Sequence, residues 1–185
     1  MRIISGKWKG RQLSKLPNKF QRSDLRPTMD RVRETLFNIL VHGEYVNPIG
    51  SRVLDLFSGT GSIGFEALSR GADYACFVDS NQNSINLLNE NIKKLETHEK
   101  VTILKRNATK LGKNIEGKFN LVFLDPPYGK GLGELAISSA LEENWIAYGA
   151  TVVWEENSNI VVPKELILVE NRLFGSIQLN FLTYS

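Results

Sequence analysis

The chain has 185 residues, 42% of them hydrophobic, which is typical of a globular protein with a full core. Its single cysteine, Cys76, excludes an internal disulfide, and its two histidines lie far from any cysteine cluster, so we expect no metal site. The N-terminus lacks an apolar leader and no apolar run approaches a membrane span. We therefore expect one cytoplasmic, monomeric domain over residues 1–185 with no membrane partner.

The net charge of +3 is unevenly distributed along the chain. Residues 1–34 carry ten basic and three acidic side chains, a net charge of +7, whereas the remainder has a net charge of −4. Arginine outnumbers lysine in the basic segment, and arginine makes bidentate contacts with phosphate. A basic segment on a mildly acidic body indicates nucleic-acid binding. Trp8 and Phe20 lie among these charges, where they either stack on bases or anchor the segment to the core.

The first predicted elements belong to this basic segment. Residues 2–16 are predicted to form a short two-stranded ribbon with its turn near Gly6 and Gly10, and residues 17–27 are irregular. Thr28 is a plausible N-cap for a helix that Gly43 ends, with Val32, Leu36, Ile39 and Leu40 on one face. We divide the chain into a basic arm, residues 1–27, and a core, residues 28–185.

A regular alternation of strands and helices begins at Arg52. Apolar strand segments precede predicted helices at 62–70, 81–95 and 132–142, and another strand is predicted at 150–155. This order predicts a parallel sheet with right-handed crossovers. The tail differs, because residues 166–172 and 176–182 flank Gly175 and are predicted to form an antiparallel hairpin.

A glycine-rich turn follows the first strand of the series. Residues 53–64 read VLDLFSGTGSIG, so that a strand, a glycine turn and a helix start follow one another. This arrangement is typical of a nucleotide-type site at the carboxyl end of a parallel strand. Gly59, Gly61 and Gly64 match the dinucleotide spacing, but Asp55 within the strand suits a ligand with positive charge better than a pyrophosphate.

Polar residues follow the next strands as well. The strand 75–78 ends in Asp79, about 20 residues beyond the turn, where a ribose-binding carboxylate is expected. The strand 101–104 leads to Asn107 and Ala108, and the strand 121–124 ends in Asp125. Because the carboxyl ends of parallel strands meet at one edge of a sheet, these groups are predicted to converge on a single crevice.

Residues 125–128 read Asp-Pro-Pro-Tyr. The Asp125 carboxylate and the Pro126 carbonyl are acceptors for two N–H bonds, and the Tyr128 ring offers a stacking face. Pro126 and Pro127 restrict the backbone, which would hold the acceptors in place before a substrate arrives. Such a group can hold a planar amine, although a proline-stiffened turn after a strand is the alternative when the tetrapeptide is considered alone.

Taken together, these motifs resemble a class I S-adenosylmethionine-dependent methyltransferase that acts on an exocyclic amine. Residues 2–11 and 25–38 are further similar to the bacterial small-subunit ribosomal RNA guanine-N2 methyltransferases of the D type. The resemblance covers essentially the whole chain and implies an α/β fold, with a Rossmann-like seven-stranded sheet that ends in an antiparallel hairpin. One departure is Asn107, which stands where many class I enzymes have an acid that accepts from the adenine amino group.

The resemblance also implies which residues carry the activity and what they contact. The target base is expected to meet Asp125, Pro126, Pro127 and Tyr128. S-adenosylmethionine is expected to contact a set of strand-end and loop residues: Asp55, Phe57, Ser58, Gly59, Thr60, Gly61, Asp79, Ser80, Asn107 and Ala108. Small-subunit ribosomal RNA, free or in an assembling subunit, is expected to contact a basic set: Lys7, Lys9, Arg11, Arg22, Arg26, Thr28, Arg31 and Arg33.

Two alternatives remain. A DNA adenine-amine methyltransferase would use the same tetrapeptide, but the chain has no room for a separate target-recognition domain. A non-catalytic RNA-binding ribosome-assembly factor would tolerate loss of Asp125 or of the glycine turn, and both are present.

Overall fold

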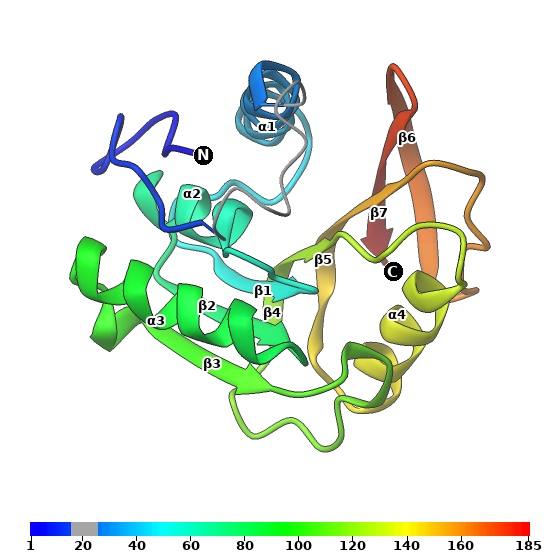
Figure 1. Cartoon of the computed structure of the whole chain (residues 1–185). Helices are drawn as coiled ribbons and strands as arrows, with labels where there is room; N and C mark the ends of the chain where they lie inside the picture. Colours follow the sequence, from blue (N-terminus) through cyan, green and yellow to red (C-terminus); the bar gives the residue numbers. More distant parts are fainter. Residues whose placement is uncertain (16–25) are drawn as a thin grey trace.

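The computed structural model describes residues 1–15 and 26–185, with only the backbone of 26–29. Its centre is a seven-stranded sheet in the order β3-β2-β1-β4-β5-β7-β6 (Figure 1). The strands are β1 Arg52–Leu56, β2 Tyr74–Asp79, β3 Val101–Lys105, β4 Phe119–Leu124, β5 Ile146–Glu156, β6 Leu166–Phe174 and β7 Ile177–Tyr184. The first five are parallel, whereas β7 is antiparallel to both β5 and β6. The predicted α/β sheet with a terminal hairpin is therefore confirmed.

Four helices pack on the two faces of this sheet. They are α1 Arg26–His42, α2 Ser62–Ser69, α3 Gln82–Leu95 and α4 Leu132–Glu142. In the described part of the chain, short 3-10 turns at His98–Lys100 and Ala108–Lys110 precede β3 and β4. Buried side chains of α1, α2 and α3 share one core with alternate residues of β1, β2 and β4, and α4 belongs to the core on the other face. This alternation follows from the two-residue period of a strand.

The N-terminal segment packs against the first of these cores. Ile3, Trp8 and Leu13 are buried there together with Leu36 and Phe37 of α1. The Glu66 carboxylate on α2 accepts hydrogen bonds from the backbone N–H groups of Ile4 (2.7 Å) and Ser5 (3.0 Å). Trp8 is 6% exposed, so the indole anchors the segment and does not offer a free stacking face.

Two local predictions for this part of the chain are wrong. Residues 2–15 contain an isolated antiparallel bridge between Arg2 and Gln12 in place of a two-stranded ribbon. The helix begins at Arg26 and not after Thr28, so Thr28 lies inside the first turn and is not its N-cap. The predicted apolar face is present, with Val32, Leu36 and Leu40 buried and Ile39 partly buried, and the helix ends at His42, directly before Gly43.

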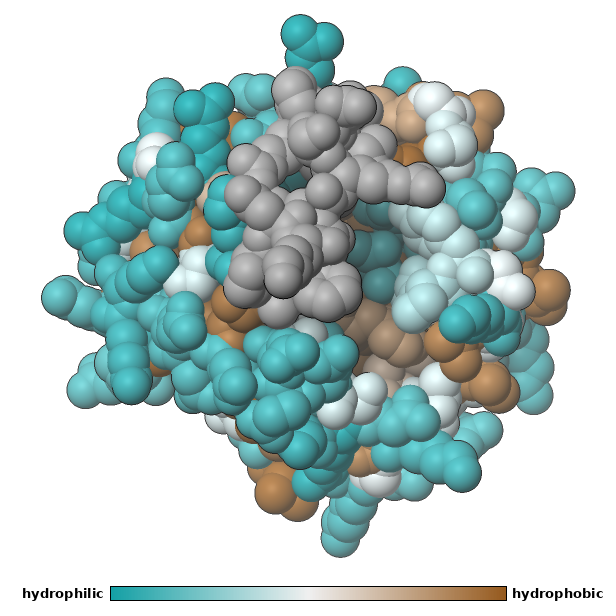
Figure 2. Space-filling model, viewed as in Figure 1, coloured by the Kyte–Doolittle hydropathy of each residue, from teal (hydrophilic) through white to brown (hydrophobic). Residues whose placement is uncertain are grey.

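Within the described part of the chain, no helix is both long and apolar enough to cross a bilayer. The face of the molecule in Figure 2 is mainly hydrophilic, with apolar side chains in small separate groups.

Candidate active site

The polar strand ends meet where the strand order changes direction. The chain runs outward from β1 to β2 and β3, then returns to place β4 on the other side of β1. The loops after β1 and β4 therefore leave the sheet side by side and diverge, which is the usual position of a ligand site in an open α/β sheet. An open cavity of about 540 Å³ lies here and is lined by residues of both loops and of the β2–α3 connection.

The glycine turn after β1 is fixed by hydrogen bonds to the end of β2. The Ser58 hydroxyl donates to the Asp55 carbonyl (2.5 Å) and to the Val78 carbonyl (3.1 Å). Gly61 has φ +75°, and a Cβ built there would lie 2.6 Å from the Leu88 side chain, so both the conformation and the close packing require glycine. Phe57 also has a positive φ of 60°, which is rare for an aromatic residue and marks local backbone strain.

Asp79 at the end of β2 closes the turn from the other side. Its Oδ2 accepts from the Gly59 N–H (2.8 Å) and its Oδ1 accepts from the Asn81 N–H (2.7 Å). Asp79 lines the cavity together with Phe57 and Ser80. Each carboxylate oxygen keeps a further lone pair that a ligand hydroxyl can use.

Asp55 lies under the start of α2 and is 3% exposed. Its Oδ2 accepts from the Gly64 N–H (3.1 Å). Burial raises the pKa of the Asp55 carboxyl to about 7, against the effect of the Gly64 hydrogen bond, and the nearby Asp79 charge raises it further. A cationic ligand nearby would favour the ionised form of Asp55.

The Asp-Pro-Pro-Tyr segment forms the opposite wall of the cavity, in which all four residues take part. Burial raises the pKa of Asp125 well above its ordinary value, and the carboxylates of Glu155, Asp55 and Glu156 add to the effect. The Tyr128 hydroxyl donates to Glu155 Oε1 at 2.5 Å, which fixes the direction of the half-exposed ring. Asp125 therefore sits in a site that favours its protonated form until a donor or a positive charge arrives.

Of the predicted cofactor residues, Phe57, Asp79 and Ser80 line this cavity, whereas Asp55, residues 58–61, Asn107 and Ala108 do not. Asn107 is exposed and caps the following 3-10 turn, where its Oδ1 accepts from the Thr109 N–H (3.0 Å) and the Thr109 hydroxyl (2.9 Å). Ala108 is 3% exposed and packs in the core below α4. The structure thus uses the Asn107 carbonyl locally, and neither residue lines the cavity.

The basic residues predicted to contact RNA fall into three groups. Lys7, Lys9, Arg11 and Arg31 are exposed. Arg33 is not: it is 5% exposed, donates to the Arg2 carbonyl (2.7 Å) and pairs with Asp30 (3.0 Å). Its placement contradicts a contact with RNA phosphates, because the guanidinium is held inside the core beside Glu66. The side chains of Arg22, Arg26 and Thr28 lie outside the described residues.

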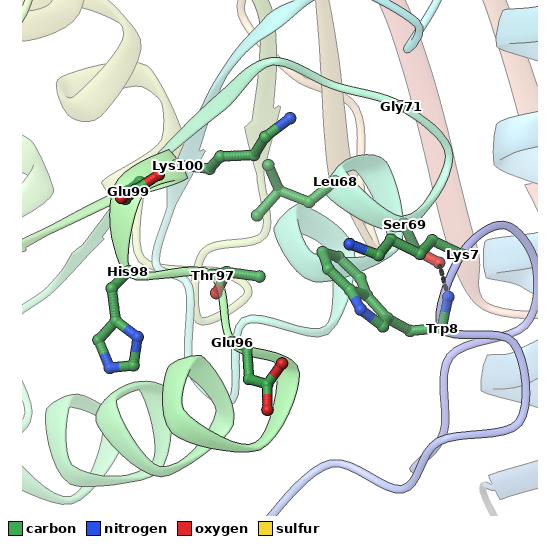
Figure 3. Close-up of a pocket in the computed structure, with 10 residues that line it drawn as sticks. All are labelled: Lys7, Trp8, Leu68, Ser69, Gly71, Glu96, Thr97, His98, Glu99 and Lys100. Atoms are coloured by element: carbon green, nitrogen blue, oxygen red, sulfur yellow. Dashed lines mark hydrogen bonds between the residues drawn. The ribbon is translucent and has the colours of Figure 1, made fainter.

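A second cavity, of about 430 Å³, lies away from the strand ends (Figure 3). Lys7 and Trp8 of the N-terminal segment line it together with the turn at residues 96–100, and none of the strand-end acids does. In the described part of the chain no group of three or more histidine, cysteine or acidic residues is arranged to hold a metal ion.

Glu155, the partner of Tyr128, is not among the site residues predicted from the sequence. The signal was present, since Glu155 and Glu156 are two carboxylates at the end of the predicted strand 150–155. Strand pairing was needed to reveal the contact, because it places β5 directly beside β4.

A family model described as "Conserved hypothetical protein 95" matches residues 1–183. The chain is 36% identical to Ribosomal RNA small subunit methyltransferase D of Haemophilus influenzae, over 96% of this chain and 90% of that protein. The corresponding Escherichia coli protein is 34% identical, over 96% and 86%. The chain belongs to this methyltransferase family.

A solved structure extends the comparison to three dimensions. The Escherichia coli protein yhhF, provisionally assigned as a methyltransferase, has a TM-score of 0.85 and 32% identity, over 100% of this chain and 98% of that one. The methyltransferase fold therefore spans the whole chain.

Proposed function

We propose that this family member transfers a methyl group from S-adenosylmethionine to the exocyclic N2 amine of a guanine in small-subunit ribosomal RNA. The observation that carries the proposal is the position of Asp125 and Pro126, two acceptors at the end of β4, on the wall of the same cavity as Asp79. The names of the relatives, ribosomal RNA small subunit methyltransferase D, support the substrate class.

The residues around the cavity fit this cofactor. Asp79 offers unused acceptor positions suited to ribose hydroxyls, and Phe57 and Ser80 lie beside it. The Asp79 carboxylate faces the cavity directly, whereas Asp55 is buried behind the glycine turn and does not line it. When bound, S-adenosylmethionine supplies a methyl group attached to a sulfonium, which is electrophilic.

The residues of the chain act on the amine. The lone pair of the guanine N2 is delocalised into the ring, so the amine is a weak nucleophile that depends on positioning. The Asp125 carboxylate and the Pro126 carbonyl accept its two hydrogens and orient the lone pair. As the nitrogen gains positive charge, both acceptors bind its hydrogens more strongly, which lowers the barrier. The nitrogen then gives up one proton, and Asp125, whose pKa burial raises, is placed to receive it.

The proposal is tested by methyl transfer from labelled S-adenosylmethionine to small ribosomal subunits from a strain that lacks this gene. The products are digested to nucleosides and analysed by mass spectrometry. Labelled N2-methylguanosine is the expected result. Label on duplex DNA in place of the subunit would support the adenine-amine alternative, and no transfer to either would support the assembly-factor alternative.

A further inference from the structure

Glu155 occupies the position next to Asp125 across the sheet. Leu124 of β4 pairs with Trp154 of β5 in parallel register, so the following residues, Asp125 and Glu155, are neighbours. Phe123 and Val153, two residues earlier on each strand, both belong to the core beneath α1 and α2. Because strand side chains alternate, Asp125 and Glu155 face the same side, and both line a small cavity against α1 and α2.

The strand-end cavity of about 540 Å³ adjoins this small cavity of about 40 Å³ at Asp125. Asp125 lines both, Asp79 and Tyr128 line only the first, and Glu155 lines only the second. A group held by Asp125 therefore has Glu155, Arg33 and Ser62 as the polar side chains of the adjoining cavity.

The Glu155 carboxylate is largely buried, and among the described residues only one of its two oxygens accepts a hydrogen bond. It is 9% exposed, and its Oε1 accepts from the Tyr128 hydroxyl at 2.5 Å. Among the described residues, no hydrogen bond reaches Oε2. Burial raises the pKa of Glu155, the hydrogen bond from Tyr128 opposes that effect, and a further donor bound to the carboxylate would stabilise its charged form. Arg33, 5% exposed, lines the same cavity; its Nε has no hydrogen-bond partner but lies 3.9 Å from the Glu66 carboxylate, so the guanidinium is already ion-paired there.

The two candidate bases differ in the atom beside the reacting amine. In guanine the N2 amine adjoins the N1–H, so that the edge presents donors in a row. In adenine the N6 amine adjoins an N1 lone pair, which a carboxylate repels. Enzymes that act on an extruded base read it through this edge.

We propose that Glu155 accepts the N1–H of the guanine whose amine is held by Asp125 and Pro126, and that it thereby selects guanine over adenine. The inference rests on the proposed function and assigns the specificity of that site to one residue. The Tyr128 hydroxyl donates to Glu155, so the carboxylate and the tyrosine ring are held in a fixed relative position. A bound guanine would therefore contact both side chains.

The test uses a base that keeps the amine and lacks the N1–H. Small subunits are reconstituted with ribosomal RNA that carries either guanine or 2-aminopurine at the nucleotide that the methyl-transfer assay identifies as the target. The value of kcat/KM is then measured for each substrate. We expect the wild-type protein to prefer guanine by at least about 100-fold, because the analogue leaves Glu155 facing a lone pair. Equal rates on the two substrates would overturn the proposal without any variant.

Two variants then assign the preference to a residue. Glu155→Gln should lower the ratio of kcat/KM on guanine to kcat/KM on 2-aminopurine at least about tenfold, since a carboxamide can turn its N–H₂ toward the N1 lone pair of the analogue. Glu156→Gln is the matched control: it removes the same charge one residue away, at a side chain whose Oε1 accepts from the Asn157 N–H (3.0 Å), and should leave the ratio unchanged. An unchanged ratio in Glu155→Gln would contradict the proposal.

The result also separates this inference from the function on which it rests. A wild-type protein that binds S-adenosylmethionine but methylates neither substrate contradicts the proposed function. A wild-type protein that methylates both equally contradicts only the role of Glu155.

Discussion

Asp55 links the site to the stability of the fold. Its pKa is about 7 in the folded protein and about 3.9 in an unfolded chain, so the unfolded state loses this proton first as pH rises. Below about pH 4, Asp55 does not change the free energy of unfolding. Between about pH 4 and 7 it lowers this free energy progressively, and above about pH 7 the reduction is constant at about 4 kcal/mol.

Asp55→Asn should remove this loss, because asparagine keeps an acceptor for the Gly64 N–H without a charge. Urea unfolding of the wild type and of Asp55→Asn at several pH values measures the difference in the free energy of unfolding. The stability gained by the variant should grow from near zero at about pH 4 to a plateau above about pH 7. A difference that does not vary with pH would show that Asp55 titrates normally.

Asp79 should govern affinity for the cofactor. Asp79→Ala removes the acceptors for the Gly59 and Asn81 N–H groups as well as those proposed for ribose, so the dissociation constant for S-adenosylmethionine should rise at least about tenfold. Isothermal titration calorimetry measures this, with Asp79→Asn, which retains one acceptor oxygen, as the milder comparison. An undiminished affinity in the alanine variant would remove Asp79 from the ribose site.

At the scale of elements, the attachment of the N-terminal segment and α1 to α2 depends on Glu66. This carboxylate is fully buried and accepts from two N-terminal backbone N–H groups and from Arg70 Nε (2.8 Å), while Arg33 lies on its other side. Burial lowers the pKa of Arg33, and the charges of Glu66 and Asp30 oppose that effect. The ion pairs therefore hold the guanidinium in its charged form.

Arg33→Ala should lower the free energy of unfolding by about 3 kcal/mol, because it leaves buried acidic groups with fewer partners. Arg31→Ala, on the exposed side of the same helix, is the control and should leave stability within about 0.5 kcal/mol of the wild type. Denaturant unfolding compares them. Equal stability of the two variants would contradict the structural role of Arg33.

The sequence predicted the alternating strands and helices well because apolar runs and glycine turns are local signals. α4 has the predicted bounds, and of the polar strand ends predicted to converge, Asp79 and Asp125 line one cavity, whereas Asp55 and Asn107 do not. Arg33 was misplaced because it lies beside the apolar stripe of α1, and its burial depends on Glu66, a residue of another helix. Asn107 caps the next turn through its Oδ1, and its predicted contact with adenine stays a prediction. The burial of Arg33 depends on a contact that local pattern does not encode.

At the scale of the whole molecule, the basic N-terminal segment sits against the helices that flank the site. Lys7, Lys9, Arg11 and Arg31 are exposed, and the last is carried by α1, which lines the cavity that holds Glu155. Arg31 would bind a phosphate backbone on the α1 side of the site, whereas Lys7 lines the cavity that lies away from the strand ends.

Arg31→Ala should weaken RNA binding and reduce the slope of log affinity against log salt by about one, since one phosphate contact releases about one counterion. Filter binding over a range of salt concentrations measures the slope. An unchanged slope with the same affinity would show that Arg31 takes no part in RNA binding.

In the proposed reaction Asp125 acts on the amine and not on the cofactor. Turnover and S-adenosylmethionine affinity, measured together for Asp125→Ala, test this role. We expect turnover to fall at least about 100-fold while the dissociation constant stays within about twofold of the wild type. Turnover that persists at the wild-type rate, or a loss of cofactor binding large enough to explain the defect, would contradict it.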